Sequence, residues 1–327
     1  MRAAVLLAVV LLLGGCGGGD RPAAPAKAAE PARSPAVSAT PAGRVVPLAP
    51  DPEGMVFDPV TGLLAVAVRS PDRLLLVDGA TGAVRREVRL PGHARHLQLA
   101  APGGPVLVPA EDADTLVEVS LPDGGTTAVE VGRYPHDAAQ LPDGRLLVGD
   151  ELGGTLSVVT DGRVTATLTD QRQPGGVAVS GDVAGVVDVG AFTLSTYDVA
   201  AARRTAVVGA GRGPTHVVAG GRGRFLVADT RGNAVLVFSA APLRPATRFA
   251  LPGTPYGLAY DPARQLLWVT LTATNEVVAL SAAGDRLTEV ARLRTVRQPD
   301  TVAVDPGSGR VFVAGRTTGQ LQVVDGG

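Results

Sequence analysis

The sequence predicts an all-β protein in which seven blades, each a four-stranded antiparallel sheet, close into a β-propeller. Three observations support this prediction: a segment recurs seven times, the apolar runs are short, and turn-forming residues separate them. The 327 residues include 42 glycines and 26 prolines but only 3% aromatic residues, which is typical of many tight turns between short strands.

The recurring segment begins with proline, or once with alanine, and continues with two variable positions and alternating apolar residues. Its copies begin at residues 52, 94, 135, 174, 214, 255 and 299. The spacings of 42, 41, 39, 40, 41 and 44 residues match the roughly 40–45 residues of one four-stranded propeller blade. We therefore assign residues 43–327 to a single propeller domain.

Within the first copy, we expect four strands at residues 55–58, 63–67, 73–77 and 84–90, separated by the turn sequences DPVTG and DGATG. Helices are disfavoured because the apolar runs are short and lack a 3.6-residue spacing. An open solenoid of the same strands is the structural alternative. Against it, the last copy ends after its third strand, and residues 44–48 match the missing fourth strand. An N-terminal strand is thus expected to complete the last blade and remove the free edge.

The first 16 residues have the pattern of an export signal. Arg2 precedes an apolar run over residues 3–13, which is too short for a stable membrane span. The run ends in LGGC (13–16), which resembles the lipobox of bacterial lipoproteins, whose cysteine is acylated, for example with palmitate. Cys16 is the only cysteine, so no disulfide forms within the chain. An ordinary secretory leader with an incidental cysteine is the alternative.

Residues 17–42 contain no aromatic residue and, apart from Val37, no large aliphatic residue, so we expect a disordered Pro/Ala-rich tether. Together with lipidation of Cys16, this predicts a monomer anchored to a membrane in the cell envelope, outside the cytoplasm, in the periplasm or on the outer surface. The formal net charge of −1 argues against nucleic-acid binding.

The candidate site lies at the centre of the ring. The innermost strand of each blade lines the central channel, so the variable positions of the repeat should share one rim. The rim residues predicted in this way are Glu53, Arg95, His96, His136, Asp137, His216, Tyr256 and Asp300. Loops after the second strands add the carboxylates Glu111, Asp112, Asp114, Asp150, Glu151, Asp188 and Asp229. The remaining histidine, His93, is interpreted as an exposed turn residue.

Imidazoles and carboxylates on one rim can bind a divalent cation or provide a base near neutral pH. The candidate metal ligands are Glu53, Asp137 and Asp300, for Ca²⁺, Mg²⁺, Mn²⁺ or Zn²⁺, and the candidate catalytic residues are His136, Asp137 and His216. None of them has a diagnostic metal-binding spacing. In the alternative interpretation, the rim is merely polar and its histidines bond to the backbone at strand ends.

The segments YPHD (134–137), GPTH (213–216) and TPYGLAYD (254–261), each followed by two Val-rich strands, resemble the repeats of YncE-like (YVTN-type) seven-bladed propellers. The resemblance covers nearly all of residues 43–327. It implies an exported protein of binding type, while related propellers include lactonases and streptogramin lyases. Glu53 is similar to the metal-binding glutamate of gluconolactonase-type propellers, which have six blades. We therefore expect a binding module for a small molecule or an envelope protein. The alternative is a metal-assisted hydrolase or lyase of lactone-like substrates at the same rim.

Overall fold

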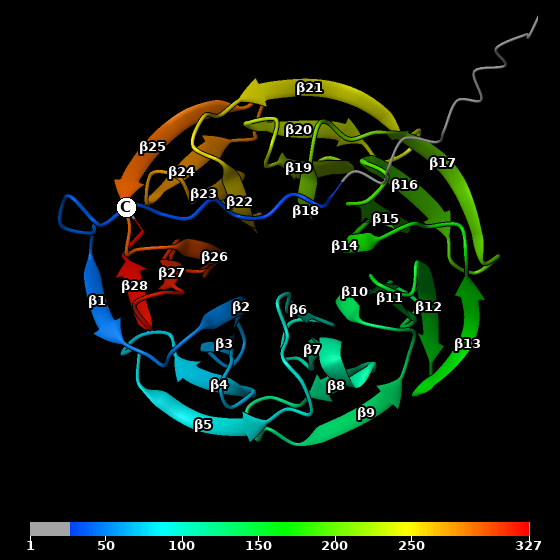
Figure 1. Cartoon of the computed structure of the whole chain (residues 1–327), viewed down its shortest axis with the longest axis horizontal. Coiled ribbons are helices and arrows are strands. Elements are labelled where there is room, and N and C mark those ends of the chain that lie inside the picture. The colour runs from blue at the N-terminus through cyan, green and yellow to red at the C-terminus, as the bar shows by residue number, and fades with distance from the viewer. Residues whose placement is uncertain (1–26, 327) are drawn as a thin grey trace, which may run out of the picture.

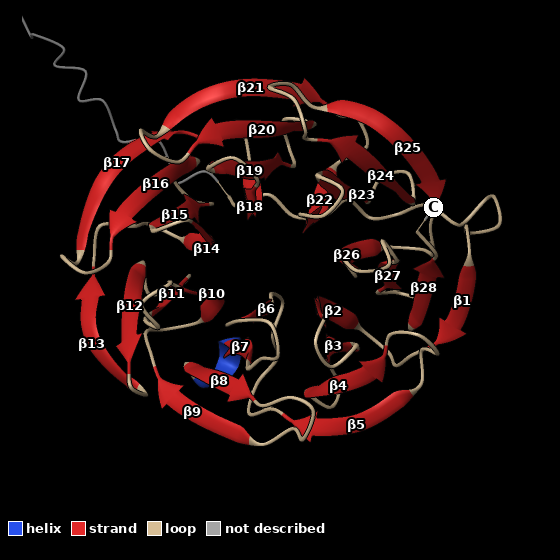
Figure 2. Cartoon of the chain, turned by 180° about the vertical axis from the view of Figure 1, so that it is seen from behind, coloured by secondary structure: helices blue, strands red, loops and turns tan. Residues whose placement is uncertain are grey.

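The computed structural model describes residues 27–326 and contains seven four-stranded antiparallel sheets around a central axis (Figure 1). In each sheet the four strands lie side by side, ordered from the centre of the ring to its outside. Figure 2 shows the same arrangement from the opposite face. The only helix in the described residues is the 3₁₀ turn η1 (Glu111–Ala113). The predicted all-β, seven-bladed fold is confirmed.

Each sheet contributes an inner strand, two middle strands and an outer strand. In that order, the first four sheets are β2 (Pro52–Asp58), β3 (Leu63–Val68), β4 (Arg73–Asp78), β5 (Val84–Arg89); β6 (Gln98–Leu99), β7 (Val106–Ala110), β8 (Thr115–Val119), β9 (Thr126–Glu130); β10 (Pro135–Gln140), β11 (Leu146–Asp150), β12 (Thr155–Thr160), β13 (Arg163–Leu168); and β14 (Pro174–Ser180), β15 (Val183–Asp188), β16 (Thr193–Asp198), β17 (Arg203–Gly209). The last three are β18 (Pro214–Gly220), β19 (Arg224–Asp229), β20 (Ala234–Ser239), β21 (Arg244–Ala250); β22 (Pro255–Asp261), β23 (Leu266–Leu271), β24 (Glu276–Ser281), β25 (Thr288–Arg294); and β26 (Pro299–Val304), β27 (Val311–Gly315), β28 (Gln320–Val324), β1 (Arg44–Pro47).

The ring closes as the sequence predicts, because β1 supplies the outer strand of the last blade. It pairs antiparallel with β28, with Val45 opposite Gln322. The fully buried Gln322 amide donates hydrogen bonds to the carbonyl oxygens of Ala42 and Arg294, and its Oε1 accepts one from the Val296 N–H. The first and last strands of the described residues are thereby joined within one sheet, which excludes an open solenoid.

The core lies between neighbouring blades. The middle strands are buried on both faces, as in β3, where all six residues are buried, whereas the outer strand β5 is mostly exposed. Apolar side chains of adjacent sheets pack together; the rings of Phe57 and Phe312, from the first and last blades, stack with their centroids 5.4 Å apart. Turn residues act as predicted: the Asp78 carboxylate accepts a hydrogen bond from the Thr81 N–H at 2.8 Å.

Residues 27–42, here called the strap, cross one face of the ring beside its centre, as the blue trace in Figure 1 shows. The Ala32 N–H donates to Thr272 Oγ1, the buried Ser34 donates its N–H to Gln298 Oε1, and the Asn275 amide donates to the Pro35 carbonyl. These residues differ from the disordered tether that their composition predicts, because polar side chains of the blades satisfy their backbone groups.

The leader over residues 1–16, Cys16 and the first part of the expected tether, residues 17–26, lie outside the described residues. Between residues 27 and 326, there is no helix of the length and apolar character needed to cross a membrane.

Candidate functional site

In six of the seven blades the rim residues lie at a β-bulge at the start of the inner strand, whereas Arg95 and His96 precede the short inner strand β6. In β2 the pairing with β3 jumps from Pro52 to Met55, and in β18 the pairing with β19 jumps from Pro214 to Val217. Similar shifts occur at the starts of β10, β14, β22 and β26. A bulge removes residues from the hydrogen-bonded ladder and redirects their side chains. The repeat thus presents its variable positions to the centre of the ring.

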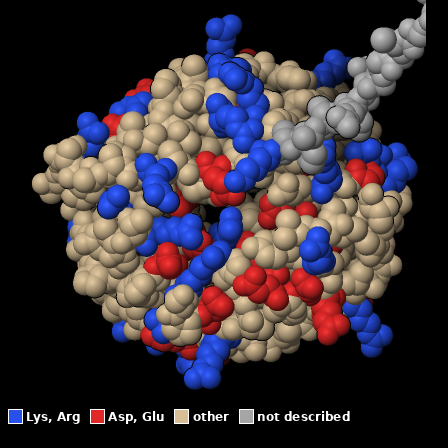
Figure 3. Space-filling model, in the orientation of Figure 1, with Lys and Arg blue, Asp and Glu red and all other residues tan. Residues whose placement is uncertain are grey.

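These side chains surround a central cavity of about 470 Å³ that is lined by the inner strands. Seven of the eight predicted rim residues line it: Glu53, Arg95, His96, Asp137, His216, Tyr256 and Asp300. The eighth, His136, packs behind His96, with ring centroids 4.6 Å apart. Basic and acidic side chains alternate around the central opening on the strap face (Figure 3). The structure therefore brings the predicted rim residues together.

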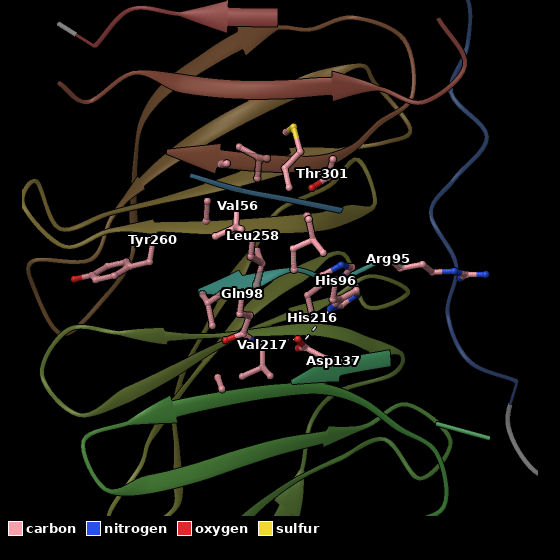
Figure 4. Close-up of a pocket in the computed structure, with 18 of the residues that line it drawn as sticks. Val56, Arg95, His96, Gln98, Asp137, His216, Val217, Leu258, Tyr260 and Thr301 are labelled. Atoms are coloured by element: carbon pink, nitrogen blue, oxygen red, sulfur yellow. Dashed lines mark hydrogen bonds and ion pairs between the residues drawn. The ribbon is translucent and has the colours of Figure 1, made fainter. Parts of the chain in front are cut away.

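Two imidazoles and a phenol form a continuous cluster at the strap end of the cavity. The rings of His96 and His216 stack with centroids 4.3 Å apart, and the Tyr256 ring meets His216 edge-on at 4.4 Å. Figure 4 shows His96 and His216 side by side, with Asp137 next to them. The Asp137 carboxylate accepts hydrogen bonds from the N–H groups of Ala138 and Val177 and lies 3.5 Å from His96 Nδ1.

Two carboxylates hold His136 behind this cluster. Its Nδ1 lies 2.7 Å from Glu111 Oε1 and 3.1 Å from Glu151 Oε2. Burial by itself would lower the pKa of His136, but the charges of Glu151 and Glu111 outweigh it and raise the pKa to about 10. His136 is therefore an imidazolium at neutral pH. Its role is to form ion pairs with Glu111 and Glu151, and it is not available to accept a proton.

His216 has the opposite character. Burial, reinforced by the nearby charges of His96 and His136, places the pKa of His216 well below its ordinary value. Its Nδ1 is buried and has no hydrogen-bond partner among residues 27–326. The His216 side chain lines the cavity, and a neutral imidazole can accept a hydrogen bond, or a proton, at its unprotonated ring nitrogen.

His93 is not the exposed turn residue that the sequence suggests. It is buried, its Nε2 contacts Glu111, and its Nδ1 contacts Asp112. The 3₁₀ turn η1 places Glu111 between His93 and His136, a contact between blades that the local sequence does not reveal.

Most of the other loop carboxylates support the backbone and do not face the cavity. Asp188 accepts hydrogen bonds from the N–H groups of Arg172 and Gln173, and Asp229 accepts them from Arg212 and Gly213. Asp150 accepts hydrogen bonds from the hydroxyls of Thr155 and Ser157, and Asp114 accepts one from the Tyr134 N–H. Among the predicted loop carboxylates, only Glu111, Asp112 and Glu151 contact the histidines between the second and third blades.

The three candidate metal ligands do not converge. Glu53 is bound by two guanidinium groups, with Arg69 Nε at 2.5 Å and Arg316 Nη2 at 2.8 Å, while Asp300 accepts the Gln298 amide at 2.8 Å. Over the described range, no group of three or more His, Cys, Asp or Glu side chains is placed to hold a metal ion. His96 and His216 do not form a metal site either. The lone pairs of an imidazole lie in the plane of its ring, so the nitrogens of two stacked rings do not point at a common ion. These residues do not fit a divalent cation.

The arginines that neutralise Glu53 were missed by the sequence analysis, although the repeat contains their signal. Arg69 and Arg316 immediately follow the second strands of their blades, β3 and β27, and Glu111 and Glu151 hold the same position after β7 and β11. The register of the second strand thus defines a second ring of rim positions. Only the contacts decide which of these residues pair.

No family model and no curated protein sequence matches the chain. Solved structures match in fold. Hydrazine synthase from Kuenenia stuttgartiensis matches with a TM-score of 0.73 and 19% identity, over 85% of this chain and 96% of that chain. Virginiamycin B lyase from Staphylococcus aureus matches with a TM-score of 0.72 and 13% identity, over 86% of this chain and 98% of that one. A chain of a mitotic checkpoint complex matches with a TM-score of 0.73 and 12% identity, over 94% of this chain and 98% of that one. At these identities the similarity establishes the propeller fold alone.

Proposed function

We propose that this protein is a cell-envelope binding module that holds a small amphipathic molecule in the central cavity of its propeller. The observation that supports this most strongly is the cavity itself, which is polar at the strap end and apolar further in. Arg95, His96 and His216 line the polar end, while Val217 and Leu258 line the interior (Figure 4). Small-molecule sites are typically concave and mostly apolar, with a few fixed polar groups.

The polar groups are held in place before a ligand arrives. His216 is stacked on His96, and the Asp137 carboxylate next to them is fixed by two backbone N–H groups and by the Gln98 amide at 2.9 Å. Side chains that are already ordered lose little conformational entropy on binding. A rigid ring of seven inner strands therefore suits selective binding.

Thermal-shift screening of the purified full-length chain against a panel of amphipathic molecules tests this proposal. A binding compound should lose its effect when the cavity is filled by Val217→Trp and keep it in Val207→Trp, which places the same side chain at an exposed position of the outer strand β17. Equal binding to both variants would place the site elsewhere and overturn the proposal.

A second candidate function is lyase-like or hydrolase-like chemistry on lactone-like substrates at the same cavity. It is favoured by one observation, the neutral imidazole of His216 at the cavity wall, which is unprotonated and so can accept a proton. A structural neighbour is a virginiamycin B lyase. In this case His216→Ala would abolish turnover of a lactone-like substrate but leave its binding largely intact. Turnover that survives this change would exclude His216 as the base.

The envelope location rests on the leader sequence. We infer that Cys16 is acylated after removal of residues 1–15 and that the protein is attached to a membrane outside the cytoplasm, as a monomer. Cys16→Ser should release the protein into the soluble fraction or leave the leader uncleaved. Unchanged fractionation of this variant, together with a mature mass lacking acyl chains in the wild type, would refute the anchor.

A further inference from the structure

Arg95 is a charged group at the cavity whose side chain forms no hydrogen bond within residues 27–326. Its guanidinium lies 3.6 Å from Glu111 and 3.8 Å from Glu30, which is beyond hydrogen-bonding distance in both cases. Its Nε is buried, and no acceptor within residues 27–326 bonds to it. A guanidinium carries five N–H donors in a planar fork that matches carboxylate or phosphate groups. Arg95 therefore has unused donors at the polar end of the cavity.

The backbone that carries Arg95 is fixed. It lies so close to the first blade that a Cβ added at Gly54 would be 2.8 Å from the Arg95 carbonyl oxygen. The side chain is about 30% exposed and extends from the imidazole cluster toward the strap (Figure 4). A fixed backbone with a partly free guanidinium is the arrangement expected of a group that meets a ligand.

The strap brings a carboxylate of the same chain to this group. Glu30 and Pro31 form part of the cavity wall, and Glu30 is the strap residue that approaches Arg95. Ser34, a few residues further on, is buried and bound to Gln298, so the strap is held to the ring next to the point where Glu30 reaches the cavity. The Glu30 side chain itself is about 58% exposed and has no hydrogen bond in the described part of the chain.

We propose that the cavity binds an anionic amphiphile whose carboxylate or phosphate group occupies the donors of Arg95, and that Glu30 of the strap is its internal competitor. This inference rests on the proposed binding function and specifies its ligand class. The apolar body of the ligand lies against Leu97, Val217 and Leu258. Binding then moves Glu30, and with it the adjacent strap, away from the cavity wall.

The test uses four probes that share one chain and differ in head group: octanoate, octyl phosphate, 1-octanol and octyltrimethylammonium. Their affinities are measured by calorimetry on the full chain in lipid nanodiscs, with empty nanodiscs subtracted. We expect an anionic probe to bind at least about tenfold more tightly than the other two, and Arg95→Gln to remove that preference. The tighter of the two anionic probes identifies the head group as carboxylate or phosphate.

Glu30→Gln removes the competing charge and should tighten binding of the anionic probe about two- to fivefold. Because Glu30 is exposed, this variant keeps the fold, and Glu130→Gln on the exposed outer strand β9 is the matched control. Equal affinity for octanol and for the tighter of the two anionic probes, or equal affinity of Glu30→Gln and wild type for that anionic probe, would overturn the inference. The proposed binding function survives that result if another compound binds the wild type but not Val217→Trp. If no compound behaves in this way, the proposed binding function fails together with the inference.

Discussion

Nδ1 of His136 lies 2.7 Å from Oε1 of Glu111, whose side chain is completely buried between the second and third blades. This buried pair places a positive charge directly behind the imidazole cluster and so favours a neutral His216 at the cavity wall. The electrostatics of the candidate site are therefore set by a contact between blades.

The first prediction concerns the pH dependence of stability. The pKa of His136 is raised from 6.5 to about 10 in the folded protein, so its stabilising contribution is complete below pH 6.5 and is lost as pH rises through 10. The free energy of unfolding should fall between pH 7 and 10 by up to about 1.4 kcal/mol per pH unit. Denaturant titrations at several pH values measure this. His136→Gln should be less stable by about 3 kcal/mol at pH 7, and an unchanged slope in this variant would contradict the prediction.

The second prediction is a stabilising substitution at the rim. Burial raises the pKa of Asp300 to about 6, so its ionised form opposes folding above that pH. Asp300→Asn should increase the free energy of unfolding by about 1–3 kcal/mol at pH 8 and have little effect at pH 4. Asp137→Asn is the control, because Asp137 accepts two backbone N–H groups and its loss should destabilise. A destabilised Asp300→Asn at pH 8 would show that the contact with Arg316 dominates.

The third prediction addresses ring closure. Gln322→Ala leaves the carbonyl oxygen of Ala42 and the N–H of Val296 without their side-chain partner and removes one of the two hydrogen bonds to the Arg294 carbonyl oxygen, which keeps the Ala42 N–H. It should cost about 2–4 kcal/mol. Gln320→Ala, on the same strand β28, removes a side chain with no hydrogen bond among the described residues and should change stability by less than about 1 kcal/mol. Chemical unfolding monitored by circular dichroism compares the two. Equal effects would mean that the amide bridge does not close the ring.

The fourth prediction concerns the strap. The Gln298 amide accepts the Ser34 N–H and donates to the Ala32 carbonyl, so Gln298→Ala should free residues near Ser34 while the blades stay folded. Hydrogen exchange of the Ala32 and Ser34 amides should become faster by at least about tenfold. Gln140→Ala, at the opposite end of an inner strand, is the control and should leave these amides protected. Rapid exchange of both amides in the wild type would show that the strap is not docked in solution.

Much of the fold is local information. The seven copies with similar spacing determine the number of blades, because each copy contains one sheet that cannot bury its faces alone. Their two variable positions could be assigned to the centre of the ring before any contact was known, since the inner strand of every blade begins there. The last copy lacks a fourth strand, which predicted that an N-terminal strand, observed as β1 over residues 44–47, completes its sheet.

Pairings between blades were beyond the reach of the sequence. The sequence indicated an exposed turn at His93, which instead is buried against Glu111. The composition of residues 27–42 predicted a disordered tether, but Thr272 and Gln298 bind this segment to the ring. Glu53 could be placed on the rim but not recognised as neutralised by Arg69 and Arg316. The sequence by itself determined the seven-bladed ring and which positions face its centre, because repeat spacing and alternation act within one blade. Only the tertiary structure decided which charges meet, because those contacts join residues that are distant in the sequence and in several cases on different blades, and burial there sets their pKa values.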